Sequence, residues 1–226
     1  MREVILDTET TGLDPSQGHR IVEIGCVELV NHVPTGRTWQ SYLNPEREMP
    51  TEAAMVHGLT DEFLAKQPLF SEIADAFLQF IGDEPLVAHN ASFDIGFMNA
   101  ELTHHGFAPL AVERVIDTLP IARKMFPGAP ASLDALCKRF GVDATNRQLH
   151  GALLDARLLA DVYLELRGGR QPDLAITVAA VKEMGIIEPR AREFLEPRIH
   201  APSEEELHTH EAFLAQIKDP LWRRSA

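Results

Sequence analysis

The chain has 226 residues, 45% of them apolar and 24% charged, and a formal net charge of −13. This length allows one substantial hydrophobic core with some chain left over. The negative charge argues against a protein that binds nucleic acid through contacts with the phosphates alone. No apolar run reaches the roughly 20 residues of a membrane helix, and the acid at Glu3 comes too early for a secretory signal. We therefore expect a soluble, cytoplasmic protein with no membrane partner.

Apolar patterning and turn residues predict the secondary structure along the chain. Three strands come first, at 3–7, 21–30 and 38–43, with a hairpin signal at Pro34-Thr35-Gly36. Helices at 51–57 and 71–81 follow, the second with Ser71 as its cap, and then a short buried strand at 86–88. The remaining elements are helices at 92–104, 119–125, 132–140 and 151–166, and a strand at 115–117. This order predicts an α/β fold, a mixed central β-sheet flanked by helices.

The pair Gly168-Gly169 interrupts this pattern, and prolines punctuate the residues that follow. We place a domain boundary at this point. Residues 1–167 are expected to form the α/β domain. Residues 168–226 are expected to form a hinge and a tail, because their prolines leave too little uninterrupted chain for a second core.

Two carboxylates close the first apolar run, Val4-Ile5-Leu6. Asp7 and Glu9 are two residues apart, so they project from the same side of a strand. On their own they could equally be a solvated strand end.

Two further acids fall on apolar helix faces. Asp94 and Asp155 share these faces with Phe97, Met98 and Glu101 on the first helix and Leu158, Leu159, Val162 and Leu166 on the second. A charged carboxylate on a buried face is costly unless it is paired or bound to metal, and no Lys or Arg stands at helical spacing there. Asp94 alone could also be an acid stabilised by the helix dipole. Several carboxylates meeting at one point would form a two-metal phosphodiesterase site.

Three segments carry a more specific signal. They are Asp7-Thr8-Glu9-Thr10-Thr11-Gly12, His89-Asn90-Ala91-Ser92-Phe93-Asp94 and His150-Gly151-Ala152-Leu153-Leu154-Asp155-Ala156. In sequence, order and separation they resemble the three motifs of the DEDDh 3′–5′ exonucleases. Within that family, residues 1–167 are most similar to the epsilon branch, whose members proofread for bacterial DNA polymerase III.

This resemblance implies an RNase H-like exonuclease fold and hydrolysis with two Mg²⁺ or Mn²⁺ ions. Asp7 and Asp155 would bind the ions, Glu9 would support one of them, and Asp94 would act directly or through water. Asp7, Glu9 and Asp155 would also border the substrate. His150 is the expected general base, since an imidazole can take a proton from water near neutral pH. A histidine rather than a tyrosine at this position is what marks the DEDDh branch.

The resemblance also implies residues that contact the terminal nucleotide. Glu52 and His57 lie about one helical turn apart, so both could face the site, although each could instead be an ordinary surface residue. Thr10, Asn90 and Phe93 are expected beside the metals, with a core position as the alternative for Phe93.

The tail contains two expected docking segments. Gln171, Leu174 and Ile176 lie in a hexapeptide similar to the sliding-clamp-binding peptides of bacterial replication proteins, although Ile176 replaces the aromatic residue that usually ends them. Ser203-Glu204-Glu205-Glu206 is a capping box that predicts a helix. The apolar residues Leu207, Leu214, Ile217 and Leu221, with Trp222, then suit packing against a partner, or against the core. By resemblance that partner is the polymerase alpha subunit.

These features together predict a metal-dependent 3′–5′ DNA exonuclease that acts on single-stranded or mispaired 3′ ends. Two other functions stay open from the sequence. A DEDDh ribonuclease that trims RNA ends would use the same catalytic motifs. A non-catalytic adaptor between clamp and polymerase would need only the tail.

Overall fold

The computed structural model describes residues 1–145, 149–169 and 201–220. The chain divides into two compact units, Met1–Leu174 and Ala175–Ala226. The predicted clamp motif with Gln171, Leu174 and Ile176 lies outside the described residues, so it stays a prediction, as does the boundary near residue 168. None of the helices in the described ranges has the length and apolar character that crossing a bilayer requires.

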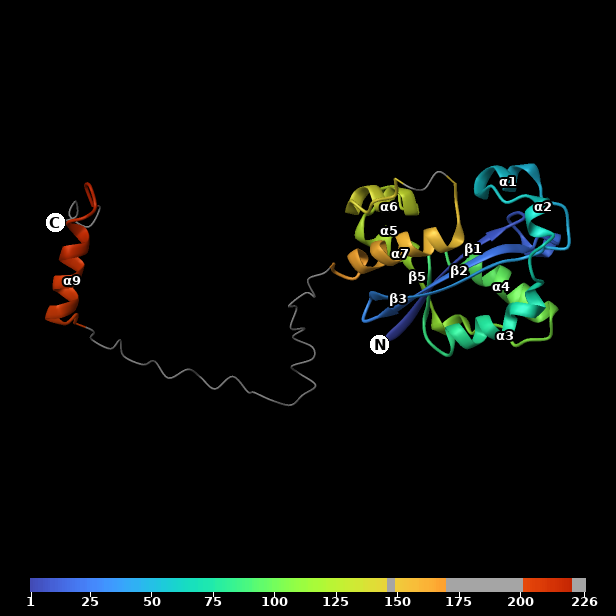
Figure 1. The fold of residues 1–226 in the computed structure, drawn as a ribbon, viewed down its shortest axis with the longest axis horizontal. Coiled ribbons are helices and arrows are strands. Elements are labelled where there is room, and N and C mark those ends of the chain that lie inside the picture. Colours follow the sequence, from blue (N-terminus) through green and yellow to red (C-terminus); the bar gives the residue numbers. More distant parts are fainter. Residues whose placement is uncertain (146–148, 170–200, 221–226) are drawn as a thin grey trace. The chain divides into compact units, whose positions relative to one another are not determined.

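The first unit is built on a five-stranded sheet (Figure 1). Its strands are β1 (Arg2–Thr10), β2 (Ile21–Val30), β3 (Val33–Tyr42), β4 (Leu86–Ala88) and β5 (Val115–Asp117), in the order β3-β2-β1-β4-β5. Strand β1 pairs antiparallel with β2 and parallel with β4. The remaining pairs are antiparallel for β2 with β3 and parallel for β4 with β5. The predicted mixed sheet is therefore confirmed.

The hairpin turn between β2 and β3 differs from the prediction. The strands are joined by Asn31 and His32, whose φ angles of 53° and 66° place both in the left-handed region, and Val30 pairs with Val33. Two left-handed residues match the twist of the flanking strands. Pro34 lies inside β3, where an edge strand tolerates a missing N–H.

The helices of the first unit follow the predicted pattern closely. They are α1 (Thr51–His57), α2 (Asp61–Leu64), α3 (Phe70–Ile81), α4 (Ser92–His104), α5 (Thr118–Met125), α6 (Leu133–Phe140) and α7 (Ala152–Leu166), with short 3₁₀ turns at Pro15–Gln17 and Val112–Arg114. The short α2 was not predicted, and Ser71 is not a cap. Helix α3 begins one residue earlier, and the Leu69 N–H donates to Glu72 Oε2 over 2.8 Å.

Side chains alternate along β1 between two apolar cores. Val4 and Leu6 pack with residues of α3 and α4, whereas Ile5 packs with residues of α5, α6 and α7. These helices accordingly cover opposite faces of the sheet (Figure 1). The carboxyl end of β1 thus lies between two layers, and each layer can deliver a side chain to it.

Helix α7 is positioned by a close contact with the sheet at Gly25 of β2. A Cβ at Gly25 would stand 2.3 Å from both the Ala152 carbonyl carbon and the Leu153 nitrogen, a separation that no real side chain allows. Gly25 also lies opposite Asp7 in the β1–β2 register. The absence of a side chain therefore lets the first turn of α7, which carries Asp155, rest directly on the strand next to Asp7.

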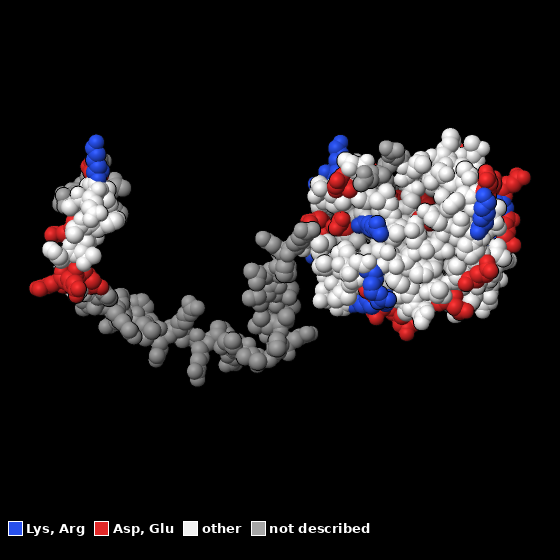
Figure 2. Space-filling model, in the orientation of Figure 1, with Lys and Arg blue, Asp and Glu red and all other residues white. Residues whose placement is uncertain are grey.

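In the second unit the structure describes residues 201–220, which include helix α9 (Glu204–Leu214). Its capping box is present as predicted, because the Glu206 N–H donates to Ser203 Oγ and the Ser203 N–H donates to Glu206 Oε2. Acidic side chains gather at the start of this helix (Figure 2). Leu207, Phe213 and Ile217 are exposed and Leu214 is buried. The predicted Leu221 and Trp222 lie outside the described residues.

We predict that Gly25→Ala destabilises the protein by about 1–3 kcal/mol, the usual range for overpacking, because the added methyl group must push α7 off the sheet. The measurement is urea denaturation. Gly96→Ala on α4 is the matched control, since no atom outside the local helix backbone lies within 4 Å of its Cβ position and alanine favours a helix by roughly 0.5–1 kcal/mol. If both substitutions changed the free energy of unfolding equally, the close packing of α7 on Gly25 would be contradicted.

Candidate active site

Three side chains that can bind metal converge at the end of β1. Each of Glu9, His150 and Asp155 offers one ligand atom, and these atoms lie within 4.8 Å of one another. Glu9 comes from β1, Asp155 from the first turn of α7, and His150 from the residue before the N-cap of α7. Glu9 is 9% exposed and Asp155 4%. Two buried carboxylates therefore share a small volume with one imidazole.

His150 is held on two sides. Its Nδ1 lies 3.1 Å from Asp155 Oδ2, and its backbone N–H donates to the Val56 carbonyl over 3.1 Å. The neighbouring Leu149 covers Gly58, where a Cβ would stand 2.6 Å from Leu149 Cδ1. The imidazole is nevertheless 44% exposed. The backbone is thus tied to α1 while the ring can reach solvent.

Asp94 lies on α4 and contacts β1 from the face of the sheet opposite to α7. Its side chain is 4% exposed, and Thr8 Oγ1 donates to Asp94 Oδ1 over 2.7 Å. Burial raises the pKa of Asp94 to about 7; the bond from Thr8 opposes this rise, and the charge of Asp117 adds to it. Without a cation, this carboxyl group therefore favours a proton.

The structure tests the predicted convergence of acids only in part. Asp155 and Asp94 are both buried with the apolar neighbours that the helical pattern predicted. Asp7 and Glu9 share one side of β1, but Asp7 and Asp94 lie outside the trio of Glu9, His150 and Asp155. Glu101 on the Asp94 face is neutralised by Arg20 of the loop before β2, a partner that helical spacing could not reveal.

These residues fit a divalent cation. Carboxylate oxygens are the ligands that magnesium and manganese prefer, whereas imidazole is less suited to them. Two such oxygens lie close together in the trio, and a bound cation would also allow Asp94 to ionise. By the chemistry of the donors, the carboxylates suit such a cation better than the imidazole does.

A cavity of about 560 Å³ adjoins the trio through Glu9. It is lined by the end of β1 and the following loop, by α1 and by α4: Thr8, Glu9, Thr10, Thr11, Gly12, Leu13, Asp14, Gln17, His19, Pro50, Glu52, Ala53, Val56, His57 and Phe93. Pockets of this volume hold small ligands. Of the predicted nucleotide contacts, Thr10, Glu52, His57 and Phe93 are in the lining.

Asn90 is placed differently from the other predicted contacts and is absent from this lining. Its φ angle is 64° and its backbone N–H donates to Asp117 Oδ1 over 3.0 Å. The cavity lining also includes the loop residues Leu13, Gln17 and His19, which the sequence patterns did not indicate. An apolar residue, Leu13, directly after the Gly12 turn is the one sequence feature that marks this part of the lining.

His57 lines the cavity and has a defined tautomer. The Leu59 N–H donates to His57 Nδ1 over 3.1 Å, so the proton of the neutral ring resides on Nε2. Burial lowers the pKa of His57, nearby His150 lowers it further, and the backbone of Thr10 acts in the opposite direction. Nε2 is buried near the Thr10 backbone and makes no hydrogen bond of normal geometry in the described structure.

We predict a pH-dependent stability that metal reverses. In its unfolded state Asp94 has the ordinary pKa of 3.8, against about 7 when folded. Between these values the folded state holds a proton that the unfolded state has released, so metal-free protein loses stability as pH rises from about 4 to 7. Asp94→Asn should flatten this slope and should raise the melting temperature in EDTA at pH 8.

Magnesium should raise the melting temperature of the wild type at pH 8, because it binds the ionised native site, and should raise that of Asp94→Asn less. Thermal denaturation with EDTA or Mg²⁺ measures both effects. Asp75→Asn is the control, since Asp75 is exposed on α3. The same pH slope in Asp94→Asn and wild type would contradict the assignment.

Comparison with known proteins gives consistent results. The RNase T family model, described as an exonuclease, matches residues 4–163. DNA polymerase III subunit epsilon of Rickettsia felis is 52% identical over 222 residues, which cover 96% of this chain and 97% of that protein. The subunit of the same name from Escherichia coli K12 is 42% identical over 242 residues, covering 98% and 97%.

Solved structures show the same fold. Exonuclease X in complex with 5′ overhanging duplex DNA has a TM-score of 0.58 and 28% identity, covering 74% of this chain and 91% of that chain. The nuclease domain of 3′hExo, a DEDDh family member bound to rAMP, has a TM-score of 0.61 at 18% identity, covering 74% and 92%. The second likeness concerns the fold alone. The predicted RNase H-like exonuclease fold is confirmed.

Proposed function

This chain belongs to the RNase T exonuclease family, together with the epsilon subunits of DNA polymerase III, and from that premise we propose how its residues perform the reaction. It is a metal-dependent 3′–5′ exonuclease with a proofreading function. We propose that it releases nucleoside 5′-monophosphates from single-stranded or mispaired DNA 3′ ends. The observation that carries the mechanism is the meeting of Glu9, His150 and Asp155 beside a nucleotide-sized cavity.

The metal site is proposed to hold two Mg²⁺, or Mn²⁺, through Asp7, Glu9, Asp94 and Asp155. Two such ions supply stabilisation of the attacking and departing oxygens. The residues themselves are arranged for this task, because β1 provides two carboxylates on one side and each helical layer provides one more. The contact of α7 with Gly25 holds Asp155 next to the strand.

His150 is proposed as the general base. Asp155 Oδ2, 3.1 Å from Nδ1, accepts the Nδ1 proton of the neutral ring and leaves the lone pair on Nε2. The half-exposed ring can then take a proton from water at Nε2 and return it to solvent. The tie of its backbone to Val56 keeps the ring beside the substrate cavity.

The terminal nucleotide is proposed to occupy the cavity. His57 and Glu52 lie on the same helix and both line the cavity. Phe93, half-buried against Phe97, offers a ring face to a base or sugar. Thr10 borders the cavity next to Glu9. The residues that line the cavity thus offer the terminal nucleotide both polar and stacking contacts.

We propose that residues 168–226 tether the exonuclease to its partners, the sliding clamp through Gln171, Leu174 and Ile176 and the polymerase III alpha subunit through the helical tail. The exposed Leu207, Phe213 and Ile217 of the described tail support such docking. Tethering raises the effective concentration at the primer end, which offsets the poor DNA affinity of an acidic protein. It would place a cytoplasmic protein at the nucleoid.

We predict that His150→Gln lowers kcat on a 3′-labelled single strand by about 10²–10⁴-fold, the usual contribution of a general base, and leaves Mg²⁺ affinity nearly unchanged. His104→Gln, exposed on α4, is the control.

Digestion of paired and mispaired DNA 3′ ends, and of RNA ends of matched sequence, with and without Mg²⁺ tests the activity itself. Faster digestion of RNA than of DNA would contradict the proposed substrate.

Deleting residues 168–226 should leave hydrolysis of free single strands within about twofold and abolish copurification with the polymerase, since the described α/β fold is complete at Leu166. Gel filtration with the alpha subunit and single-strand digestion measure the two effects. Loss of hydrolysis in the truncated protein would place part of the tail in the catalytic fold.

A further inference from the structure

The loop between β1 and β2 carries a histidine whose position depends on a glycine. The His19 ring occupies the place where a Cβ of Gly12 would stand, with Cε1, Nδ1 and Nε2 of His19 only 2.3, 2.4 and 2.5 Å from that point. This edge of the ring therefore lies over Gly12, and both residues line the cavity. Gly12 is needed here because any side chain would displace the ring.

Thr11 is hydrogen-bonded to this ring. The Thr11 side chain is fully buried, and its Oγ1 accepts a hydrogen bond from the Arg20 N–H over 3.0 Å. The Thr11 hydroxyl has one proton to donate, and His19 Nδ1 lies 3.1 Å away. With Nδ1 as acceptor, the neutral ring carries its proton on Nε2. The second nitrogen, Nε2, is then a donor on a residue that lines the cavity.

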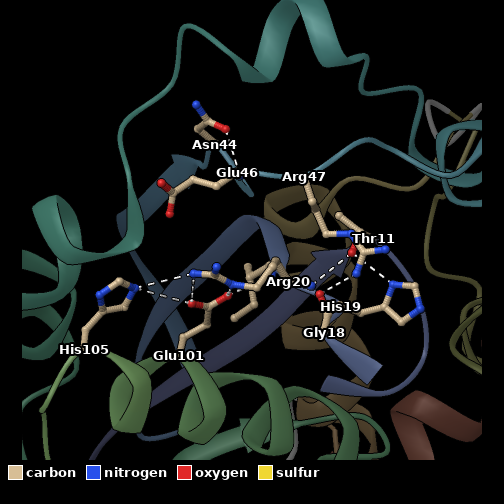
Figure 3. Close-up of polar contacts among 10 residues, drawn as sticks. Thr11, Gly18, His19, Arg20, Asn44, Glu46, Arg47, Glu101 and His105 are labelled. Carbon is tan, nitrogen blue, oxygen red and sulfur yellow. Dashed lines mark hydrogen bonds and ion pairs between the residues drawn. The ribbon is translucent and has the colours of Figure 1, made fainter. Parts of the chain in front are cut away.

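The residues on either side of His19 in the β1–β2 loop are held by hydrogen bonds (Figure 3). Arg20, the next residue, makes two hydrogen bonds of 2.7 Å to the buried Glu101 of α4, a geometry typical of strong carboxylate pairs. Arg47 donates to the carbonyl of Gly18. These contacts leave His19 little freedom, so its donor is held in place before a substrate arrives.

The side-chain donors that line the cavity are threonine hydroxyls, the Gln17 amide and two imidazoles. Among its lining residues none is Lys or Arg, and the two imidazoles are His19 and His57. His57 comes from α1 and His19 from the β1–β2 loop, so their donors come from different elements. A nucleotide presents acceptors on its base edge, sugar and phosphate, and can satisfy both.

We propose that His19 is a nucleotide-binding residue that donates from Nε2–H to an acceptor on the 3′-terminal nucleotide. This inference rests on the proposed function and assigns a further residue to the same cavity. Two acceptors could serve, one on the terminal nucleotide itself and one on the phosphate of the preceding nucleotide. The position of His19 in the lining of the cavity proposed to hold the terminal nucleotide favours the first.

Two substitutions separate a contact with substrate from a structural role. His19→Asn keeps a polar atom near the Nδ1 position, which preserves the bond with Thr11, and removes the group at Nε2. His19→Gln places an amide near the Nε2 position and gives up the Nδ1 contact. We expect His19→Asn to weaken binding of dTMP in the presence of Mn²⁺ by about tenfold, the loss of one hydrogen bond, and to raise KM on a single-stranded oligonucleotide with kcat unchanged.

His19→Gln should stay within about threefold of the wild type in both measurements, and His104→Asn on the exposed face of α4 serves as the control. The opposite ranking, with Gln impaired and Asn normal, would show that His19 only anchors the loop and would overturn the inference. So would unchanged dTMP binding in His19→Asn with a raised oligonucleotide KM, which would move the contact to the preceding phosphate. Wild-type protein that neither binds dTMP nor digests DNA would refute the proposed function instead.

Discussion

The site depends on how closely the first turn of α7 approaches the sheet. A helix packed on a sheet normally stands off by the thickness of the side chains between them, but at Gly25 the strand offers none. Asp155 therefore lies near the end of β1, close to Glu9. His150 precedes α7, and its backbone is hydrogen-bonded to Val56 of α1. One missing side chain thus brings together groups that lie more than a hundred residues apart in sequence.

Charge is the second constraint on this fold. The trio and Asp94 concentrate carboxylates where neither Lys nor Arg lines the cavity, and burial raises the pKa of Asp94. Such a site is unfavourable without cations and well suited to bind them. The same acidity weakens attraction to DNA, because the protein carries a net charge of −13. In the proposed mechanism, bound metals and a tether to the polymerase would offset this weak attraction.

The sequence predicted much of the fold because its apolar periods are regular. The bounds of β2, β4, α1 and α4 agree with the prediction, and the buried faces around Asp94 and Asp155 were read correctly. The errors arose where local signals compete, as at Pro34, whose turn-forming character hid the Asn31-His32 hairpin. Arg20 with Glu101, and His19 over Gly12, could not be predicted, because each joins residues whose proximity only tertiary packing creates.

The most direct test of this account is anomalous diffraction from crystals grown with Mn²⁺ and a nucleoside monophosphate. We predict manganese bound to carboxylate oxygens of Glu9 and Asp155, at about 2.0–2.2 Å as for small divalent ions, and the nucleoside in the cavity beside His57. Manganese bound only elsewhere, or a nucleoside outside this cavity, would contradict the claim that these carboxylates form the catalytic centre.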